Sequence, residues 1–351
     1  MTRQAVDEAK GETIGARRDP HIRLLFLLVV IIFATMSLAM PGQFPTRANL
    51  ESMAFQMSEV GILAVAMALA MLIGGIDLSI TAMANLSAIA AGLLLTRFGT
   101  HGLRTLEAAP VIALAIAAAV AVGLACGLLN GLLIGRVGVP AILATLSTLM
   151  LYTGLAYGIT RGRAVHGFPG QFLYLGNGKF VGIPLPLVVF LAVVTLLSLA
   201  LNRTAFGFKI YMLGSNPTAA KFSGIDNPKM ILHTHLIAGL LSAVAGIVIL
   251  ARTNSANADY GSSYILITIL IAVLGGVAVT GGSGRLAGVA LALAALQMLS
   301  TGFNMLLLRF SGSNFFRDFA WGLLLLCVMV WANFESRLGL RRLWQRILIR
   351  R

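Results

Sequence analysis

Ten stretches of the chain are apolar and long enough to cross a lipid bilayer, for which a helix needs about 20 mostly apolar residues. They are 24–40, 54–73, 79–95, 109–135, 139–160, 184–201, 231–251, 264–280, 286–308 and 315–334. Of the 351 residues, 58% are hydrophobic and 11% are charged, whereas soluble domains average about 25% charged residues. The sequence therefore predicts an all-α polytopic membrane protein of about ten helices, and it excludes a soluble or disordered chain.

The basic residues predict how this bundle is oriented. The formal net charge is +14, but the Lys and Arg residues lie in tails and at helix ends, which indicates topology and lipid contact rather than nucleic acid. With both termini in the cytoplasm, most of the 26 basic residues fall on the inner side, as the positive-inside rule requires. The chain then divides into a cytoplasmic tail (1–23), a transmembrane domain (24–334) and a basic cytoplasmic tail (335–351).

Two stretches, 72–94 and 273–295, resemble each other. Each places a glycine pair at the end of an apolar span, then a polar turn and a helix of small residues. We interpret them as an internal repeat in which spans two to five correspond to spans seven to ten. Glycines inside a membrane let a helix unwind where backbone groups line a cavity, as in many transporters. The glycines concerned are Gly74, Gly75, Gly275, Gly276, Gly281 and Gly282.

The segment 202–230 is the longest polar stretch on the predicted inner side. It is too polar to insert and too rich in Gly, Asn and Pro to form one helix. Asn216 followed by Pro217 predicts a helix start, with Asn216 as N-cap and Pro217 at the first helical position. This helix is expected to run to Ser223 and stop at Gly224. A short helix exposed to the cytoplasm suits the docking of a soluble partner.

Five motifs occur in one order between residues 44 and 306. They are Phe44-Pro45-Thr46 with Asn49-Leu50, Gly74 to Ser79 (GGIDLS), Val139 to Leu146 (VPAILATL), Gly214-Ser215-Asn216 with Ala219-Ala220 and Gly224-Ile225, and Leu274-Gly275-Gly276 with Thr280-Gly281-Gly282. Together they resemble the permease subunit of the ribose-type (monosaccharide) branch of bacterial ABC importers.

The resemblance implies a pair of permease subunits in the bacterial inner membrane, a cytoplasmic ATPase that holds ATP and Mg, and a periplasmic sugar-binding protein. The chain would then carry no cofactor and would not be an enzyme. It has no G-x-x-x-x-G-K-[ST] phosphate loop, so a partner would hydrolyse the ATP. The segment from Ala219-Ala220 to Gly224 is similar to the ATPase-docking loop of these permeases, although Thr218 replaces the usual acidic residue. The implied docking residues are Gly214, Asn216, Pro217, Ala219, Ala220 and Gly224.

Polar side chains inside the spans are candidates for the translocation path. Glu59 lies about 8 Å into the second span, where a charge costs at least ~2.5–3.5 kcal/mol. It is either an acceptor for sugar hydroxyls or an interfacial acid that reaches outward or is protonated. Uncharged amides and hydroxyls suit a neutral sugar, but they also form bonds between helices. These candidates are Asn85, Asn130, Thr145, Ser147, Thr148, Gln297 and Asn304.

Asp77 and Ser79 follow the first glycine pair and are predicted N-caps of the third span, with a gating or substrate role as the alternative. His233 and His235 begin the seventh span and are expected at the membrane interface, since neither has a second metal ligand at a suitable spacing.

Three functions remain open at this stage. The motif order favours a sugar permease driven by a partner ATPase. A transporter driven by an ion gradient is the alternative, with Glu59 and Asp77 as its only proton carriers. A membrane enzyme or structural subunit comes third, because the chain has no zinc motif and no nucleophile elbow.

Overall fold

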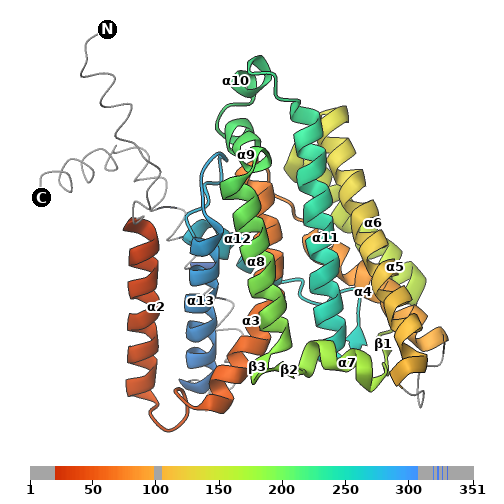
Figure 1. Cartoon of the computed structure of the whole chain (residues 1–351), viewed down its shortest axis with the longest axis vertical. Coiled ribbons are helices and arrows are strands. Elements are labelled where there is room, and N and C mark those ends of the chain that lie inside the picture. Colours follow the sequence, from red (N-terminus) through yellow and green to blue (C-terminus); the bar gives the residue numbers. More distant parts are fainter. Residues whose placement is uncertain are drawn as a thin grey trace, which may run out of the picture.

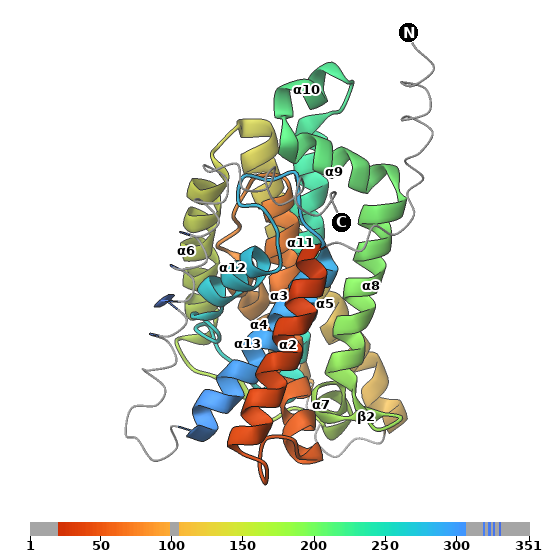
Figure 2. The ribbon, with the colours of Figure 1, turned by 90° about the vertical axis from the view of Figure 1, so that its left-hand side faces the viewer.

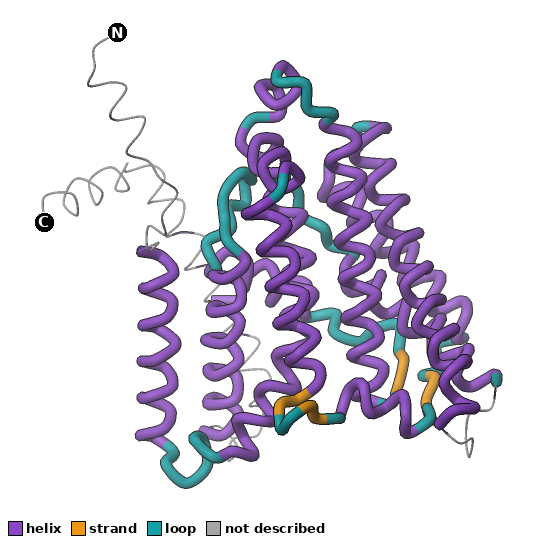
Figure 3. The backbone as a smooth tube through the Cα atoms, viewed as in Figure 1, coloured by secondary structure: helices purple, strands orange, loops and turns teal. Residues whose placement is uncertain are grey.

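The computed structural model describes residues 20–98 and 105–306, with isolated helical positions at 319, 322, 323, 326 and 330. The described part is a bundle of helices with four very short strands (Figures 1 and 3). The helices are α2 (Pro20–Ala39), α3 (Arg47–Leu72), α4 (Ile80–Arg97), α5 (Thr105–Leu132), the π-helical turn η1 (Leu133–Val137), α6 (Ala141–Thr160), α7 (Gly170–Asn177), α8 (Leu185–Arg203), α9 (Ala205–Ser215), α10 (Pro217–Phe222), α11 (Asn227–Thr253), α12 (Tyr264–Leu274) and α13 (Leu286–Leu306).

Eight helices in the described part are long and apolar enough to span a membrane: α2, α3, α4, α5 with η1, α6, α8, α11 and α13. The chain is therefore an all-α, multi-pass membrane protein. The predicted span 264–280 is wrong as a continuous helix, because α12 ends at Leu274, directly before the glycine pair. The predicted span 315–334 lies outside the described residues, apart from isolated positions.

The buried centre of the bundle consists of α3, α4 and α11, which supply about half of the buried apolar side chains. Helix α11 packs against α5 through glycines on both sides. A Cβ atom on Gly123 or Gly127 would overlap the backbone of α11, and one on Gly239 would overlap the backbone of α5. Small residues thus let these helices approach closely, as is usual for transmembrane helices. On the other side, α2 lies at the edge of the bundle against α13 (Figure 1), so that it stands in front in the view of Figure 2.

The two ends of the bundle differ. One end, which we call the hairpin end, carries α7 and the strands β1 (Val165–His166), β2 (Lys179–Phe180), β3 (Ile183–Pro184) and β4 (Ser255–Ala256) (Figure 1). β1 pairs with β4 and β2 with β3, both antiparallel. The opposite end, which we call the α10 end, carries α9 and α10, and α10 projects beyond the other helices.

The two glycine pairs end their helices with the same turn. The amide of Gly74 donates to Met71 O (2.9 Å), and that of Gly276 donates to Val273 O (2.9 Å). Gly74 has φ +81° and Gly276 has φ +85°, the left-handed conformation that favours glycine. The first glycine of one pair therefore matches the second glycine of the other, a shift of one residue from the sequence pairing. The repeat of whole helices stays a prediction.

Candidate functional site

At the α10 end, three segments far apart in the sequence meet through their backbones. The amide of Gly282 donates to the carbonyl of Leu72 (2.9 Å), which joins the loop after α12 to the end of α3. Gly214 of α9 packs against both, because a Cβ atom there would overlap Leu72 O and Gly282 N. The two predicted glycine blocks are thus in direct contact with each other and with the segment that leads to α10.

A side chain of α9 strengthens this junction. The hydroxyl of Tyr211 donates to the carbonyl of Gly284 (2.9 Å). Burial raises the pKa of the Tyr211 hydroxyl, so the phenol stays protonated and remains a donor. We call the meeting point of Leu72, Gly214 and Gly282 the glycine junction. It gives α9 a rigid connection to the loops that follow α3 and α12.

The predicted docking helix forms as expected from its local signals. Asn216 is the N-cap of α10, and its side-chain oxygen accepts from Ala219 N (3.0 Å). Pro217 occupies the first helical position. Gly224 has φ +79°, which lets the chain turn back after Ser223. The helix is one residue shorter than predicted, and α9, which precedes it, was not predicted.

Gly214→Ala is expected to lower the free energy of unfolding by about 1–3 kcal/mol, because the new methyl group must displace backbone atoms on two other segments. The matched control is Gly154→Ala in α6, where an added Cβ has nothing within 4 Å and where alanine is expected to be neutral or slightly stabilising. Thermal unfolding of both purified variants in mild detergent checks this. Equal melting temperatures would contradict the close packing at Gly214.

A buried polar network lies between the first glycine pair and α11. Asp77 is fully buried, and its Oδ1 accepts from the amide (3.0 Å) and the hydroxyl (2.6 Å) of Ser79. Its other oxygen lies 3.0 Å from Nδ1 of His235, which is 1% exposed. Asn130 of α5 donates to Ser79 Oγ (2.7 Å), and the hydroxyl of Tyr152 on α6 donates to Asn130 Oδ1 (3.2 Å). We call these five residues the Asp77 network.

Two sequence predictions about this region are wrong. Ser79 stands at the N-cap position of α4 but makes no side-chain capping bond, and Asp77 lies two residues earlier, where it binds Ser79 and His235 instead. His235 is buried inside the bundle rather than exposed at its surface, because the turn that follows α3 brings Asp77 against α11, whereas His233 is exposed. The third span therefore begins with a buried ionisable pair rather than with a simple cap.

A second buried cluster surrounds Glu59 on α3. Glu59 is 1% exposed and pairs with Arg252 of α11 through two contacts, Nε to Oε2 (2.9 Å) and Nη2 to Oε1 (2.8 Å). The hydroxyls of Tyr260 (3.2 Å) and Tyr264 (3.0 Å) also donate to Glu59. We call this group the Glu59 cluster. The alternative of an acid that reaches outward is wrong, because the carboxylate is buried and pairs with Arg252 inside the protein.

Two other path candidates, Asn85 and Thr145, form hydrogen bonds with backbone carbonyls. Asn85 of α4 donates to the carbonyls of Ala258 and Tyr260 (2.9 Å each), in the irregular segment between α11 and α12. Thr145 is fully buried and donates to Ala141 O (2.8 Å) and Ile76 O (3.1 Å). Both therefore bind backbone that leaves the regular helix pattern, as buried polar groups in a membrane must.

The last candidates differ in their exposure. Ser147 is exposed on α6, and its hydroxyl donates within the helix to Leu143 O (2.8 Å). Thr148 is buried and bonds to Thr145 O (3.3 Å). Asn304 is partly exposed on α13. The structure thus places the predicted path residues in separate groups, and their role in transport remains a prediction.

Sequence reasoning missed the partners in both buried clusters: Arg252, Tyr260, Tyr264, His235 and Tyr152. The signal for Arg252 was the unpaired acid at Glu59, since a buried charge requires a counter-charge. No local signal marks the tyrosines, because aromatic residues are common in apolar helices.

Comparison with known proteins identifies the family. Residues 49–332 match the family described as the permease component of branched-chain amino acid transport systems. The ribose import permease protein RbsC of Bacillus subtilis (strain 168) is 35% identical over 285 residues, which cover 80% of this chain and 83% of that protein. No solved structure shows a significant match.

Two further relatives are autoinducer 2 import system permease proteins LsrD. The protein from Photorhabdus temperata is 31% identical over 304 residues, covering 84% of this chain and 86% of its own length. The protein from Enterobacter sp. (strain 638) is 30% identical over 296 residues, covering 82% and 85%. The chain therefore belongs to the permease-component family of ABC import systems, as its five motifs indicate, and it is a transport subunit rather than an enzyme.

Proposed function

We propose that this chain is the transmembrane subunit of an ATP-driven importer for a neutral monosaccharide or related polyol in the inner membrane of a bacterium. A separate ATPase in the cytoplasm supplies energy, and a periplasmic protein delivers the sugar. Two permease subunits, identical or related, alternate access between the two sides. The sugar class is supported by the ribose import permease, which is 35% identical to this chain.

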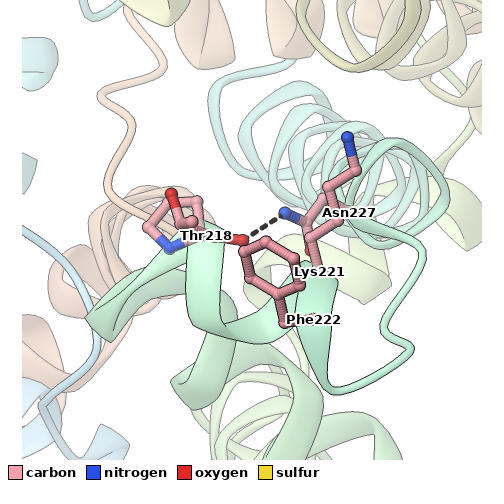
Figure 4. A pocket seen from close by; sticks show the side chains of 5 residues that line it. Thr218, Lys221, Phe222 and Asn227 are labelled. Atoms are coloured by element: carbon pink, nitrogen blue, oxygen red, sulfur yellow. Dashed lines mark hydrogen bonds between the residues drawn. The ribbon is translucent and has the colours of Figure 1, made fainter.

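The observation that carries the proposal is the form of α10. This helix projects at one end of the bundle, and Phe222 at its tip is 89% exposed. It borders a surface hollow of about 540 Å³ lined by Pro217, Thr218, Lys221, Phe222 and Asn227 (Figure 4). Asn227 donates to the carbonyl of Pro217 (2.8 Å), which ties the start of α10 to the start of α11. An exposed aromatic on a braced helix suits docking into a groove of a soluble partner.

The glycine junction supports a mechanical role for this helix. α10 follows α9 directly, and α9 contacts the ends of α3 and the loop after α12 through Gly214. A movement imposed on α10 would therefore reach the end of α3 and the loop after α12 through the packed contacts of α9. Packed interfaces of this kind switch between discrete arrangements rather than deform continuously. The expected result is alternating access driven from the α10 end.

This proposal fixes the orientation. The α10 end faces the cytoplasm and the hairpin end faces the periplasm, which agrees with the N-in orientation favoured by the basic residues. Ten spans with both termini inside remain part of the proposal, and the stretch 315–334 supplies the last of them.

Purification from the native membrane in mild detergent tests the function. We expect a soluble ATPase with phosphate-loop motifs to be recovered with this chain, and uptake of labelled sugar into vesicles to require ATP. Uptake that stops when the proton gradient is collapsed, and that is indifferent to ATP, would instead favour the ion-gradient alternative.

Phe222→Asp is expected to reduce recovery of the ATPase at least about tenfold, since a central aromatic anchor contributes 2 kcal/mol or more to an interface. Phe180→Asp is the matched control, because Phe180 is 62% exposed at the hairpin end. Quantitative pull-down with both variants checks this. If the two variants recover the ATPase equally well, α10 is not the docking element.

A further inference from the structure

Four uncharged polar side chains on α3 and α13 form a continuous hydrogen-bonded row. Gln56 donates from Nε2 to Ser52 Oγ (3.0 Å), one turn away on α3. Gln297 of α13 donates to Gln56 Oε1 (3.3 Å) and to Thr301 Oγ1 (3.3 Å). We call Ser52, Gln56, Gln297 and Thr301 the polar ladder. It crosses from one helix to the other and includes no charged group.

The polar ladder extends into the predicted spans. Gln56 is nine residues from the start of α3 at the hairpin end, but the first turns of that helix carry the paired charges Arg47 and Glu51, and Gln56 lies only about 3 Å into the apolar span 54–73. Gln297 is eleven residues from the start of α13 at the opposite end, about 16 Å along its axis. The row therefore runs from near the hairpin-end surface toward the middle of the ~30 Å hydrocarbon layer.

The ladder is also open to its surroundings. Ser52 and Gln56 are exposed, and Gln297 and Thr301 are partly exposed. An amide transferred to an apolar medium without a full set of hydrogen bonds loses several kcal/mol. Each glutamine amide offers two donor hydrogens and an acceptor oxygen, and the bonds within the ladder use only part of this capacity. This surface is therefore unsuited to contact with lipid chains, and we expect it to contact water or a polar solute.

Other polar side chains of the described spans are more enclosed. Glu59 is surrounded by one arginine and two tyrosines. Asn85 donates to two backbone carbonyls, and Asn130 binds Ser79 and Tyr152. These side chains are buried in the protein and would have to break existing bonds to contact a solute. Within the part of the chain that the structure describes, the ladder combines exposure with spare hydrogen-bonding capacity in an unbroken row.

On this basis we propose that the polar ladder is the wall of a water-filled translocation path and contacts a neutral polyhydroxy solute as it crosses. This inference rests on the proposed function and adds the residues that meet the sugar. Alternating amides and hydroxyls can exchange hydrogen bonds with any ring hydroxyl. Because no fixed charge is present, the solute is guided without being held tightly.

Cysteine labelling tests whether this face meets water. Gln56→Cys and Thr301→Cys are introduced into the full chain, with Cys126 and Cys327 replaced by alanine, in membranes that also contain the partner subunits. The probe is a charged, membrane-impermeant methanethiosulfonate reagent. The control is Thr195→Cys on α8, an exposed position about 15 Å along its helix, which is comparable to the position of Gln297 along α13. The thiolate is the reactive form and does not form in lipid, so we expect labelling of the ladder to be at least about tenfold faster than at Thr195.

A transport measurement tests contact with the solute. Gln56→Met and Gln297→Met keep side-chain length but remove the amide, and we expect each to slow ribose uptake about two- to tenfold. Thr195→Val is expected to leave uptake unchanged. Recovery of the ATPase is measured for every variant and decides the proposed function separately.

Labelling decides the inference whatever the sugar. If Gln56→Cys reacts as slowly as Thr195→Cys with and without ATP, the ladder is a dry contact with lipid or a second permease subunit, and the inference is overturned. It is equally overturned if the wild-type complex takes up ribose and both methionine variants do so at the same rate.

Discussion

Replacing Arg252 with methionine is expected to lower the free energy of unfolding by about 3 kcal/mol, the lower end of the 3–5 kcal/mol range for a buried ion pair that loses one partner. The carboxylate of Glu59 is 1% exposed and would lose the cation that pairs with it in the protein interior. The hydroxyls of Tyr260 and Tyr264 would remain as donors, which is why the loss is placed at the lower end.

The double variant Glu59→Gln with Arg252→Met is expected to recover most of this loss. Both charges are then absent, and replacing a buried ion pair by neutral groups of similar size is often neutral or stabilising. If the double variant regains stability, the loss in Arg252→Met comes from the unpaired charge and not from lost packing of the arginine side chain. Comparing the single and double variants separates these two effects.

Thermal unfolding of the detergent-purified variants is the measurement. Arg163→Met is the matched control, because Arg163 is exposed in the loop at the same end of the bundle, and surface substitutions usually change stability by less than about 0.5 kcal/mol. An Arg252→Met protein as stable as Arg163→Met, or a double variant that is no more stable than Arg252→Met, would contradict the role given to the ion pair.

The same pair shows why sequence reasoning found one half of the cluster. Glu59 stands out in an apolar span, and its cost can be calculated from its depth alone. Its partner Arg252 is 193 residues away and directly follows the predicted span 231–251, where it resembles a residue of an outer loop. Hydropathy placed the helix end before the arginine, whereas α11 continues to Thr253 because Glu59 neutralises that charge.

Local signals were more reliable than patterns shared between segments. Asn216 and Pro217 act on their own neighbours, so the start of α10 could be predicted from the sequence. The glycine pairs also ended their helices as their composition indicates. Their alignment was shifted by one residue, since the left-handed position is Gly74 in one pair and Gly276 in the other. The backbone conformation decides which glycine of one pair corresponds to which glycine of the other, and the amino-acid sequence does not specify it.

The polar ladder illustrates a different limit. The sequence marks Gln297 as a polar candidate within a span. It does not mark Gln56, because the charged Glu59 is the feature that stands out in the second span. The row exists only when α3 and α13 lie side by side, with Gln56 and Gln297 in contact. Contacts between side chains of different helices depend on the tertiary arrangement. The pattern of apolar and polar residues in a single sequence does not predict them.

Asp77→Ala is expected to lower the free energy of unfolding by about 3 kcal/mol or more, well beyond the ~0.5–2 kcal/mol for loss of an N-cap. Two donors on Ser79 and Nδ1 of His235 would lose their partner in the protein interior, and each unsatisfied buried group costs about 1–3 kcal/mol. His235 Nε2 already has no partner among the described residues, so the imidazole would be left without any hydrogen bond there.

Two further variants make this result specific to the Asp77 network. Asp226→Ala removes a true N-cap, since Asp226 is exposed and its side chain accepts from Lys229 N (3.0 Å) at the start of α11. Its loss should stay within the range of a cap. Asp77→Asn should be milder than Asp77→Ala, because the amide oxygen can still accept from Ser79 and the amide nitrogen can donate to His235 in its other tautomer. The measurement is the free energy of unfolding in detergent of the three variants, Asp77→Ala, Asp77→Asn and Asp226→Ala. If Asp77→Ala is no worse than Asp226→Ala, the bonds of Asp77 contribute no more to stability than an exposed cap does, and the role given to the buried pair with His235 is contradicted.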